Sequence, residues 1–237
     1  MRVQSPRTFT FKNGDVGWIH AVGNDKPIVR PARVDKTEHL PSKLIEGMIG
    51  MWSKQTNGHL LELSTSLGVR ASSLLELRVC WAERHNAFAF PMRDGNGDVC
   101  GIRFRSMNGE KWSLKGSRNG LFMPWCEPEP ELYVCEGGTD VCALRSLNLF
   151  AVGRPSCSGG MMDIKTLVTR LRIRRVYILA DNDKPGLGGA DSLARNLQVP
   201  CCVLTLPVKD IREFYNCGGT YQILESISRS SFWRNSI

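Results

Sequence analysis

The sequence lacks the cysteine and histidine patterns of a zinc-binding module. It has nine cysteines, but none forms a Cys-x-x-Cys pair, and the four histidines are scattered along the chain. A structural zinc site needs four nitrogen or sulfur ligands at short, paired spacings. The sequence therefore predicts no zinc. Several cysteines lie inside apolar runs, which indicates reduced and mostly buried thiols.

Long apolar segments are also missing. No stretch approaches the roughly 20 apolar residues that cross a bilayer, and the start of the chain has no apolar run of the kind found in signal peptides. Internal repeats and low-complexity tracts are absent as well. We therefore expect a soluble, cytoplasmic protein that makes no membrane contact.

Acidic residues are outnumbered. The chain has 31 Lys and Arg against 23 Asp and Glu, a net charge of +8, and a basic balance favours polyanionic partners such as nucleic acids. Residues 101–120 concentrate the excess, with Glu110 as their single acid. The cations there are Arg103, Arg105, Lys111, Lys115 and Arg118. The alternative interpretation is a solvated face of a sheet.

The first half of the chain changes character along its length. Residues 1–40 have no clear period and predict an arm of short strands or irregular structure. Helical apolar spacing follows at 41–55, 58–69 and 70–79, with Ser72 or Ser73 as the expected N-cap of the third helix. Residues 87–116 contain strand-forming residues interrupted by "DGNG" and "NG", which predicts a meander of antiparallel strands.

The second half alternates short apolar runs with helical segments. It follows the linker "CEPEPE" at 126–131, and strands are expected at 132–135, 149–152, 175–180 and 201–206. Such alternation is typical of a parallel sheet covered by helices on both faces. The expected organisation is an arm at 1–40, a mixed α/β subdomain at 41–127, an α/β domain at 128–216 and a tail at 217–237.

Acidic residues follow three of these expected strands. Glu136 ends one strand, and Asp140 lies four residues further on. Asp181 and Asp183 follow another strand, and Asp210 comes shortly after the last. In open α/β sheets, ligands bind outside the carboxyl ends of the strands. The pattern therefore places all these acids near one candidate site.

The pair Asp181 and Asp183 is the most informative part of this pattern. Side chains two residues apart on an extended segment point the same way, so two carboxylates there repel each other. A divalent cation removes that repulsion, and carboxylate oxygens suit Mg²⁺ or Mn²⁺. The alternative is a pair of exposed turn aspartates, with Asp183 as the N-cap of the following helix.

Two stretches resemble the signatures of the Toprim domain. They are "VCEGGTDVCAL" at 134–144 and "YILADNDKPG" at 177–186. Toprim domains occur in topoisomerases, bacterial-type primases and several nucleases. Two further stretches favour the primases: "PVKDIREFYNCGG" at 207–219 resembles the segment that closes their Toprim domain. The strand-rich residues 88–122 resemble the half that precedes it. The resemblance covers about residues 65–220.

The resemblance implies the catalytic core of a bacterial or phage-type DNA primase. A phage-type primase would be encoded by a phage or mobile element. The implied fold is α/β: a Toprim domain with a parallel four-stranded sheet flanked by helices, preceded by a smaller mixed α/β primase-type subdomain. The implied reaction is synthesis of short RNA primers on single-stranded DNA by nucleotidyl transfer with two Mg²⁺ or Mn²⁺ ions. The implied partners are the template strand, ribonucleoside triphosphates, and a replicative helicase or a separate zinc-bearing protein.

The same resemblance assigns roles to residues of this chain. Catalysis falls to Glu136, Asp181 and Asp183, which also hold the metal together with Asp140 and Asp210. The residues implied to contact nucleic acid or nucleotide are Arg103, Arg105, Lys111, Lys115, Arg118, Lys184 and Lys209. Gly137 and Gly186 are expected to let the backbone approach phosphate.

The sequence departs from the primase pattern in three ways. It contains neither a zinc ribbon nor a helicase-binding domain, and Arg212 stands where many primases have a second aspartate two residues after the match to Asp210. One alternative is a Toprim nuclease, although nucleases have no evident use for residues 88–122. The other is a nucleic-acid-binding adaptor without polymerase activity, which Arg212 and the missing zinc ribbon favour.

Overall fold

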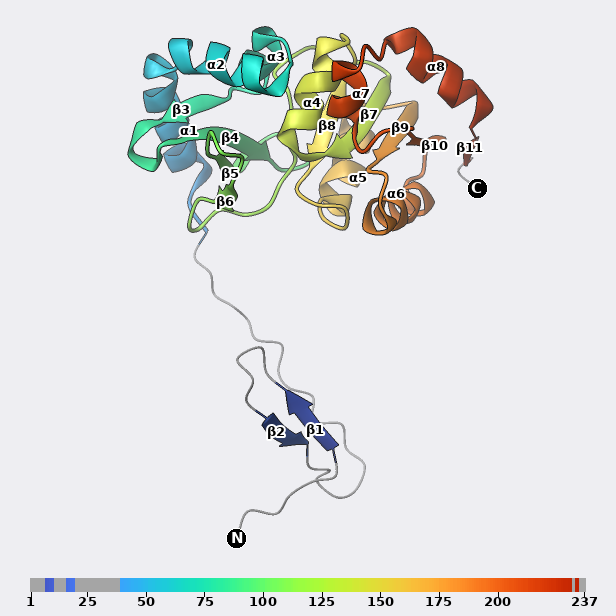
Figure 1. The fold of residues 1–237 in the computed structure, drawn as a ribbon, viewed down its shortest axis with the longest axis horizontal. Coiled ribbons are helices and arrows are strands. Elements are labelled where there is room, and N and C mark those ends of the chain that lie inside the picture. Colours follow the sequence, from blue (N-terminus) through green and yellow to red (C-terminus); the bar gives the residue numbers. More distant parts are fainter. Residues whose placement is uncertain (1–6, 11–15, 20–38, 232, 235–237) are drawn as a thin grey trace. The chain divides into compact units, whose positions relative to one another are not determined.

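The computed structural model describes residues 7–10, 16–19, 39–231 and 233–234, and it divides into two compact units (Figure 1). The first unit, Met1–Thr37, contains an antiparallel pair of strands, β1 (Arg7–Thr10) and β2 (Val16–Ile19). The parallel sheet of the predicted fold class does not extend to these two strands, which are antiparallel and lie in the predicted arm. The rest of the predicted arm, up to residue 38, lies outside the described residues.

The second unit, Glu38–Ile237, begins with the expected helices. They are α1 (Ser42–Trp52), the short 3-10 helix η1 (Ser53–Gln55), α2 (Asn57–Leu67) and α3 (Ala71–Glu76). The predicted cap of α3 is wrong. The helix begins after Arg70, whose backbone is extended, and the Ser73 hydroxyl lies inside the helix and donates a hydrogen bond to the Arg70 carbonyl at 2.6 Å.

The predicted meander is an antiparallel four-stranded sheet in the order β3-β4-β5-β6. Its strands are β3 (Cys80–Ala82), β4 (Ala87–Arg93), β5 (Val99–Arg105) and β6 (Lys111–Ser113). Every residue of β4 is buried, because apolar clusters cover both faces of the sheet. The exposed residues of this sheet are Lys111 and Ser113, both in β6.

The second sheet has five strands in the order β11-β10-β9-β7-β8. They are β7 (Glu131–Glu136), β8 (Ala151–Arg154), β9 (Arg175–Ala180), β10 (Cys201–Thr205) and β11 (Trp233–Arg234). Strands β7 to β10 run parallel, as the alternating pattern predicts. The edge strand β11, in the predicted tail, is antiparallel and makes the sheet one strand larger than expected.

Helices cover both faces of this sheet (Figure 1). They are α4 (Gly137–Ser146), α5 (Met161–Arg170), α6 (Lys184–Asn196), α7 (Ile211–Asn216) and α8 (Tyr221–Ser230). Among the described residues, none of the helices has the length and apolar character needed to cross a membrane.

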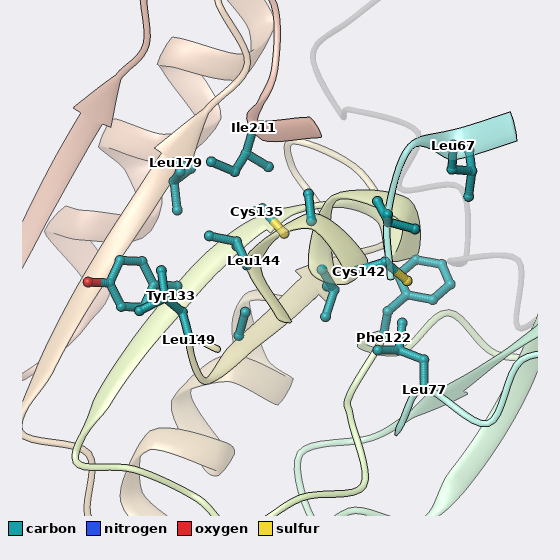
Figure 2. Close-up of a cluster of buried hydrophobic side chains, with 14 of the residues drawn as sticks. Leu67, Leu77, Phe122, Tyr133, Cys135, Cys142, Leu144, Leu149, Leu179 and Ile211 are labelled. Carbon is teal, nitrogen blue, oxygen red and sulfur yellow. The ribbon is translucent and has the colours of Figure 1, made fainter. Parts of the chain in front are cut away.

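One apolar cluster joins the early helices to the parallel sheet (Figure 2). Leu67 and Leu77 from the first half pack in the same cluster as Cys142 and Leu144 of α4. The start of α4 also lies against the antiparallel sheet, since a Cβ atom at Gly138 would be 2.8 Å from the Phe90 ring of β4. The predicted boundary between residues 127 and 128 stays a prediction, since both sides of it share this core.

Candidate functional site

The topology brings the acidic residues to one edge of the parallel sheet. Strand β9 lies between β7 and β10, and all three run in the same direction. Glu136 is the last residue of β7, Asp181 follows β9, and Asp210 lies between β10 and α7. Asp140 joins them from the first turn of α4.

These carboxylates perturb one another. Burial raises the pKa of Asp140 well above its usual value, and repulsion from Asp210 and Asp181 raises it further. Burial also raises the pKa of Asp181, followed by repulsion from Asp210 and Asp183. The pKa of Glu136 is raised by burial and then by Asp181. Burial and mutual repulsion therefore both disfavour simultaneous ionisation of these carboxylates.

Two of the aspartates have a local structural role. The Asp183 carboxylate accepts a hydrogen bond from the Gly186 N–H at 2.7 Å and caps α6, and Asp210 accepts one from the Glu213 N–H at 2.8 Å and caps α7. The N-cap interpretation of Asp183 is therefore correct. Each cap uses one carboxylate oxygen and leaves the second for another partner.

The chemistry of this donor set suits a hard divalent cation, because carboxylate oxygens are the ligands that such ions prefer. Within the ranges that the structure describes, however, no three carboxylate, imidazole or thiol groups stand close enough to ligate one ion. Ligation by Glu136, Asp181 and Asp183 together would therefore need side-chain rotation.

A cationic cavity of about 70 Å³ lies between the antiparallel sheet and the start of α4. Arg103, Arg105 and Lys111 line one side of it, and Gly137 and Thr139 line the other. The Nε atoms of both arginines are buried and have no hydrogen-bond partner among the described residues. Unpaired buried donors beside a helix N-terminus favour an anionic ligand.

Arg212 links this cavity to the acidic edge. Its Nη2 atom is 4.0 Å from Asp210 Oδ2, and its positive charge lowers the raised pKa of Asp140. Burial lowers the pKa of the Arg105 guanidinium, and the charge of Arg212 lowers it further. The Arg212 Nε is buried with no hydrogen-bond partner in the described part of the chain. Cations and carboxylates are therefore side by side.

The other predicted cations have different surroundings. Lys209 lies close enough to Asp181 to lower its pKa. Arg118 points to Asp94 instead, with Nη2 3.4 Å from Oδ2, a pair at the surface. Lys115 and Lys184 are exposed.

The two predicted glycines differ. Gly137 has a left-handed φ of 75° and lines the cationic cavity. Gly186 lies against the protein itself: a Cβ atom there would be 2.6 Å from the Asp181 carbonyl oxygen. Close packing of α6 therefore explains Gly186, while phosphate approach at either glycine stays a prediction.

Sequence reasoning missed Arg154. This residue ends β8, pairs in register with Glu136 of β7 and is only 3% exposed. Its Nε donates a hydrogen bond to the Gly159 carbonyl at 2.8 Å, and its charge lowers the raised pKa of Glu136. The available signal was a cation directly after the apolar residues of a buried strand.

Sequence reasoning also missed a groove of about 880 Å³ beside α1. Trp52, Lys54, Arg84 and His85 contribute to its lining. The His85 ring stacks on Phe104 with 4.3 Å between ring centroids, and Phe104 also lines the cationic cavity. Only the fold joins these rings and cations, because they come from separate segments of the chain.

No protein-family model and no curated protein sequence matches the chain. Solved structures do match. The E. coli primase catalytic core is similar over 81% of this chain and 80% of its own, with a TM-score of 0.64 and 16% identity. A structure of the DnaG primase catalytic domain bound to ssDNA matches over 81% of both chains, with the same TM-score and identity.

A primase fragment of the bacteriophage T7 primase-helicase protein is also similar. It matches over 68% of this chain and 72% of its own, with a TM-score of 0.52 and 17% identity. At these identities the similarity concerns the fold, which is that of primase catalytic cores.

Proposed function

We propose that the protein is a primase catalytic core, which makes short RNA primers on single-stranded DNA by metal-dependent nucleotidyl transfer. One observation carries the proposal: carboxylates that repel one another lie beside guanidinium groups with unpaired Nε atoms. Asp140 interacts with both groups, because its pKa is raised by burial and then by Asp210 and Asp181, and is lowered by Arg212 and Lys111. A metal suits the first group and a triphosphate suits the second.

Glu136, Asp181 and Asp183 would hold Mg²⁺ or Mn²⁺, with Asp140 and Asp210 in support. When bound, two such ions stabilise the attacking hydroxyl and the leaving pyrophosphate of an in-line displacement. Binding would offset the carboxylate repulsion described above.

The phosphates of the nucleotide would bind at the cationic cavity, whose volume of about 70 Å³ is too small for the whole nucleotide. Arg103, Arg105 and Lys111 supply positive charge for the phosphates, and the N-terminus of α4 adds its backbone N–H groups. Phe90 and Phe122 give the same cavity an apolar wall. This combination supports a ligand with both a polyphosphate and an organic part.

The template strand would follow the groove beside α1. Grooves for single strands combine cations along the backbone with rings on which bases stack, and Lys54, Arg84, Trp52 and His85 provide both. Contacts to phosphate carry no sequence information. We therefore expect primer start sites at many template sequences, and stimulation by a helicase or a zinc-bearing partner.

The test uses the full chain, a mixed-sequence DNA strand, four ribonucleotides and either Mg²⁺ or Mn²⁺, with products separated by length. We expect a ladder of short RNA. Glu136→Gln should abolish it without weakening DNA binding, because it removes a charge at the reaction centre only. Glu131→Gln, at the opposite end of the same strand, is the matched control and should retain activity.

Other results would identify the alternatives. Metal-dependent cleavage of the DNA strand without RNA synthesis would mean a nuclease. DNA binding without synthesis or cleavage, in either metal, would mean an adaptor. Either result would refute the proposed polymerase activity.

A further inference from the structure

A separate groove of about 480 Å³ lies at the segment that connects the two sheets. Its lining includes Arg93, Met123, Pro124, Trp125 and Glu127. The Trp125 side chain is unusual for a large apolar group, because it is 69% exposed. Its backbone is nevertheless fixed, since the Trp125 N–H donates a hydrogen bond to the Glu76 carbonyl at 2.6 Å.

Arg93 provides an unsatisfied donor in the same groove. The residue is 8% exposed, and its Nη1 donates to the Gly97 carbonyl at 2.8 Å. Its Nη2 is buried and has no hydrogen-bond partner in the described residues; the closest carboxylate oxygen, on Glu46, is 3.7 Å away. The Arg93 guanidinium carbon lies 5.2 Å from the centroid of the Trp125 ring. A buried donor therefore stands beside an exposed aromatic face.

The local charges are nearly balanced. A second guanidinium, that of Arg78, lies 5.6 Å from the Trp125 ring centroid. Glu46 pairs with both arginines, at 2.9 Å from Arg78 Nη1 and 3.7 Å from Arg93 Nη2, and Glu127 adds another negative charge to the groove. A phosphate has little to gain here, whereas a flat, neutral ring with a hydrogen-bond acceptor at its edge fits the groove.

We propose that this groove binds a nucleobase of single-stranded nucleic acid. The base would stack on the exposed Trp125 ring. Because Arg93 Nη2 is buried, a small rotation of the guanidinium would be needed for it to donate a hydrogen bond to a carbonyl oxygen or ring nitrogen of the base. The partner rests on the proposed function, but the contact does not depend on catalysis. Helix α1 contributes to both grooves: Glu46 pairs with the two arginines beside Trp125, and Trp52 lines the proposed template groove.

The test measures binding of the full chain to two labelled 20-nucleotide probes, one ordinary DNA strand and one strand of abasic sites with equal charge. Stacking on one aromatic residue contributes enough that its removal weakens binding by roughly fivefold to a hundredfold. We expect Trp125→Ala to weaken binding of the ordinary strand by such a factor. Its binding of the abasic strand, and the salt dependence of binding to either probe, should match the wild type.

Two controls sharpen the test. Leu61→Ala removes another exposed apolar side chain, 65% exposed on α2, and should leave both affinities unchanged. Trp125→Phe keeps an aromatic face and should recover most of the lost affinity. Equal affinity of Trp125→Ala and wild type for the ordinary strand would overturn the proposal and leave the groove to a protein partner. An equal loss for both probes would overturn it too, because the role would then not involve bases.

These results are independent of primer synthesis. If Trp125→Ala loses base-dependent binding and the wild-type protein makes no primers, the nucleobase site is supported and only the primase proposal is refuted. Active priming with an unaffected Trp125→Ala variant would refute only the nucleobase site.

Discussion

Asp140→Asn should make the metal-free protein more stable at neutral pH. The Asp140 side chain is 8% exposed, and burial and neighbouring carboxylates raise its pKa. A buried polar group without full compensation costs about 1–3 kcal/mol, and Arg212, Lys111 and the N-terminus of α4 offset part of that cost. We therefore expect asparagine, which has the same shape and no charge, to add about 1–2 kcal/mol to the free energy of unfolding.

The gain should depend on pH in a defined direction. The Asp140 pKa is higher in the folded than in the unfolded state, so the folded state binds the proton more tightly. Below the ordinary aspartate pKa of about 4, both states are protonated and the substitution changes little. The cost of the charge grows as the pH rises and is complete above the folded-state pKa. The advantage of asparagine should therefore appear at neutral pH and vanish in acid.

Metal should reverse the order of stability. An ion that binds only the folded protein adds about 2.7 kcal/mol at one hundred times its dissociation constant, and a variant that has lost a ligand gains less. Thermal melts in EDTA and in Mn²⁺ measure both effects, since 1–2 kcal/mol shifts the melting temperature by roughly 2–8 °C in a domain of this size. Asp98→Asn, at an exposed position, is the control and should stay within about 0.5 kcal/mol. A destabilised Asp140→Asn protein in EDTA at neutral pH would refute the reasoning.

Three more predictions concern the same region. Asp181→Asn with Asp183→Asn should remove Mn²⁺ binding measured by calorimetry while the fold persists, because asparagine is also a good N-cap; unchanged binding would place the metal elsewhere. Arg103→Ala with Lys111→Ala should weaken DNA or nucleotide binding and reduce its salt slope by roughly 0.7 for each lost contact to a single strand; an unaltered slope would mean that these cations are only a solvated face. Arg212→Gln should tighten Mn²⁺ binding several-fold, because it removes a positive charge beside the carboxylates; weaker binding would mean that Arg212 positions them.

The position of the acidic site was predictable because it depends on topology. Strand β9 has the predicted bounds, and parallel neighbours bring their carboxyl ends together whatever the detailed packing. Glu136, Asp181 and Asp210 therefore had to share one edge once β7, β9 and β10 were adjacent. Helix caps were less predictable: α3 begins after Arg70, because a tertiary hydrogen bond from the Arg70 N–H to the Ser146 hydroxyl, at 3.0 Å, holds that residue.

The cations show where reasoning from the sequence ended. Their clustering in residues 101–120 predicted a groove, yet Arg118 pairs with Asp94, whereas Arg105 and Lys111 face Asp140. Local sequence cannot say toward which side of a sheet a long side chain turns when its partners come from another domain. The contacts of the exposed Trp125 could not be predicted from the sequence either, because its neighbours Arg78 and Arg93 come from separate segments of the chain.

If the proposed metal and triphosphate bind at this site, the distribution of charge predicts that each helps the other to bind. Asp183 and Asp210 are tolerated in the metal-free protein because each caps a helix, but Asp140 and Asp181 rely on nearby cations. Lys111 serves both of them by lowering their raised pKa values. A metal that neutralises these carboxylates would release the lysine for phosphate, and a bound triphosphate would in turn bring negative charge that draws the metal in. Because coupling of this kind is reciprocal, each ligand should raise the affinity for the other by the same factor.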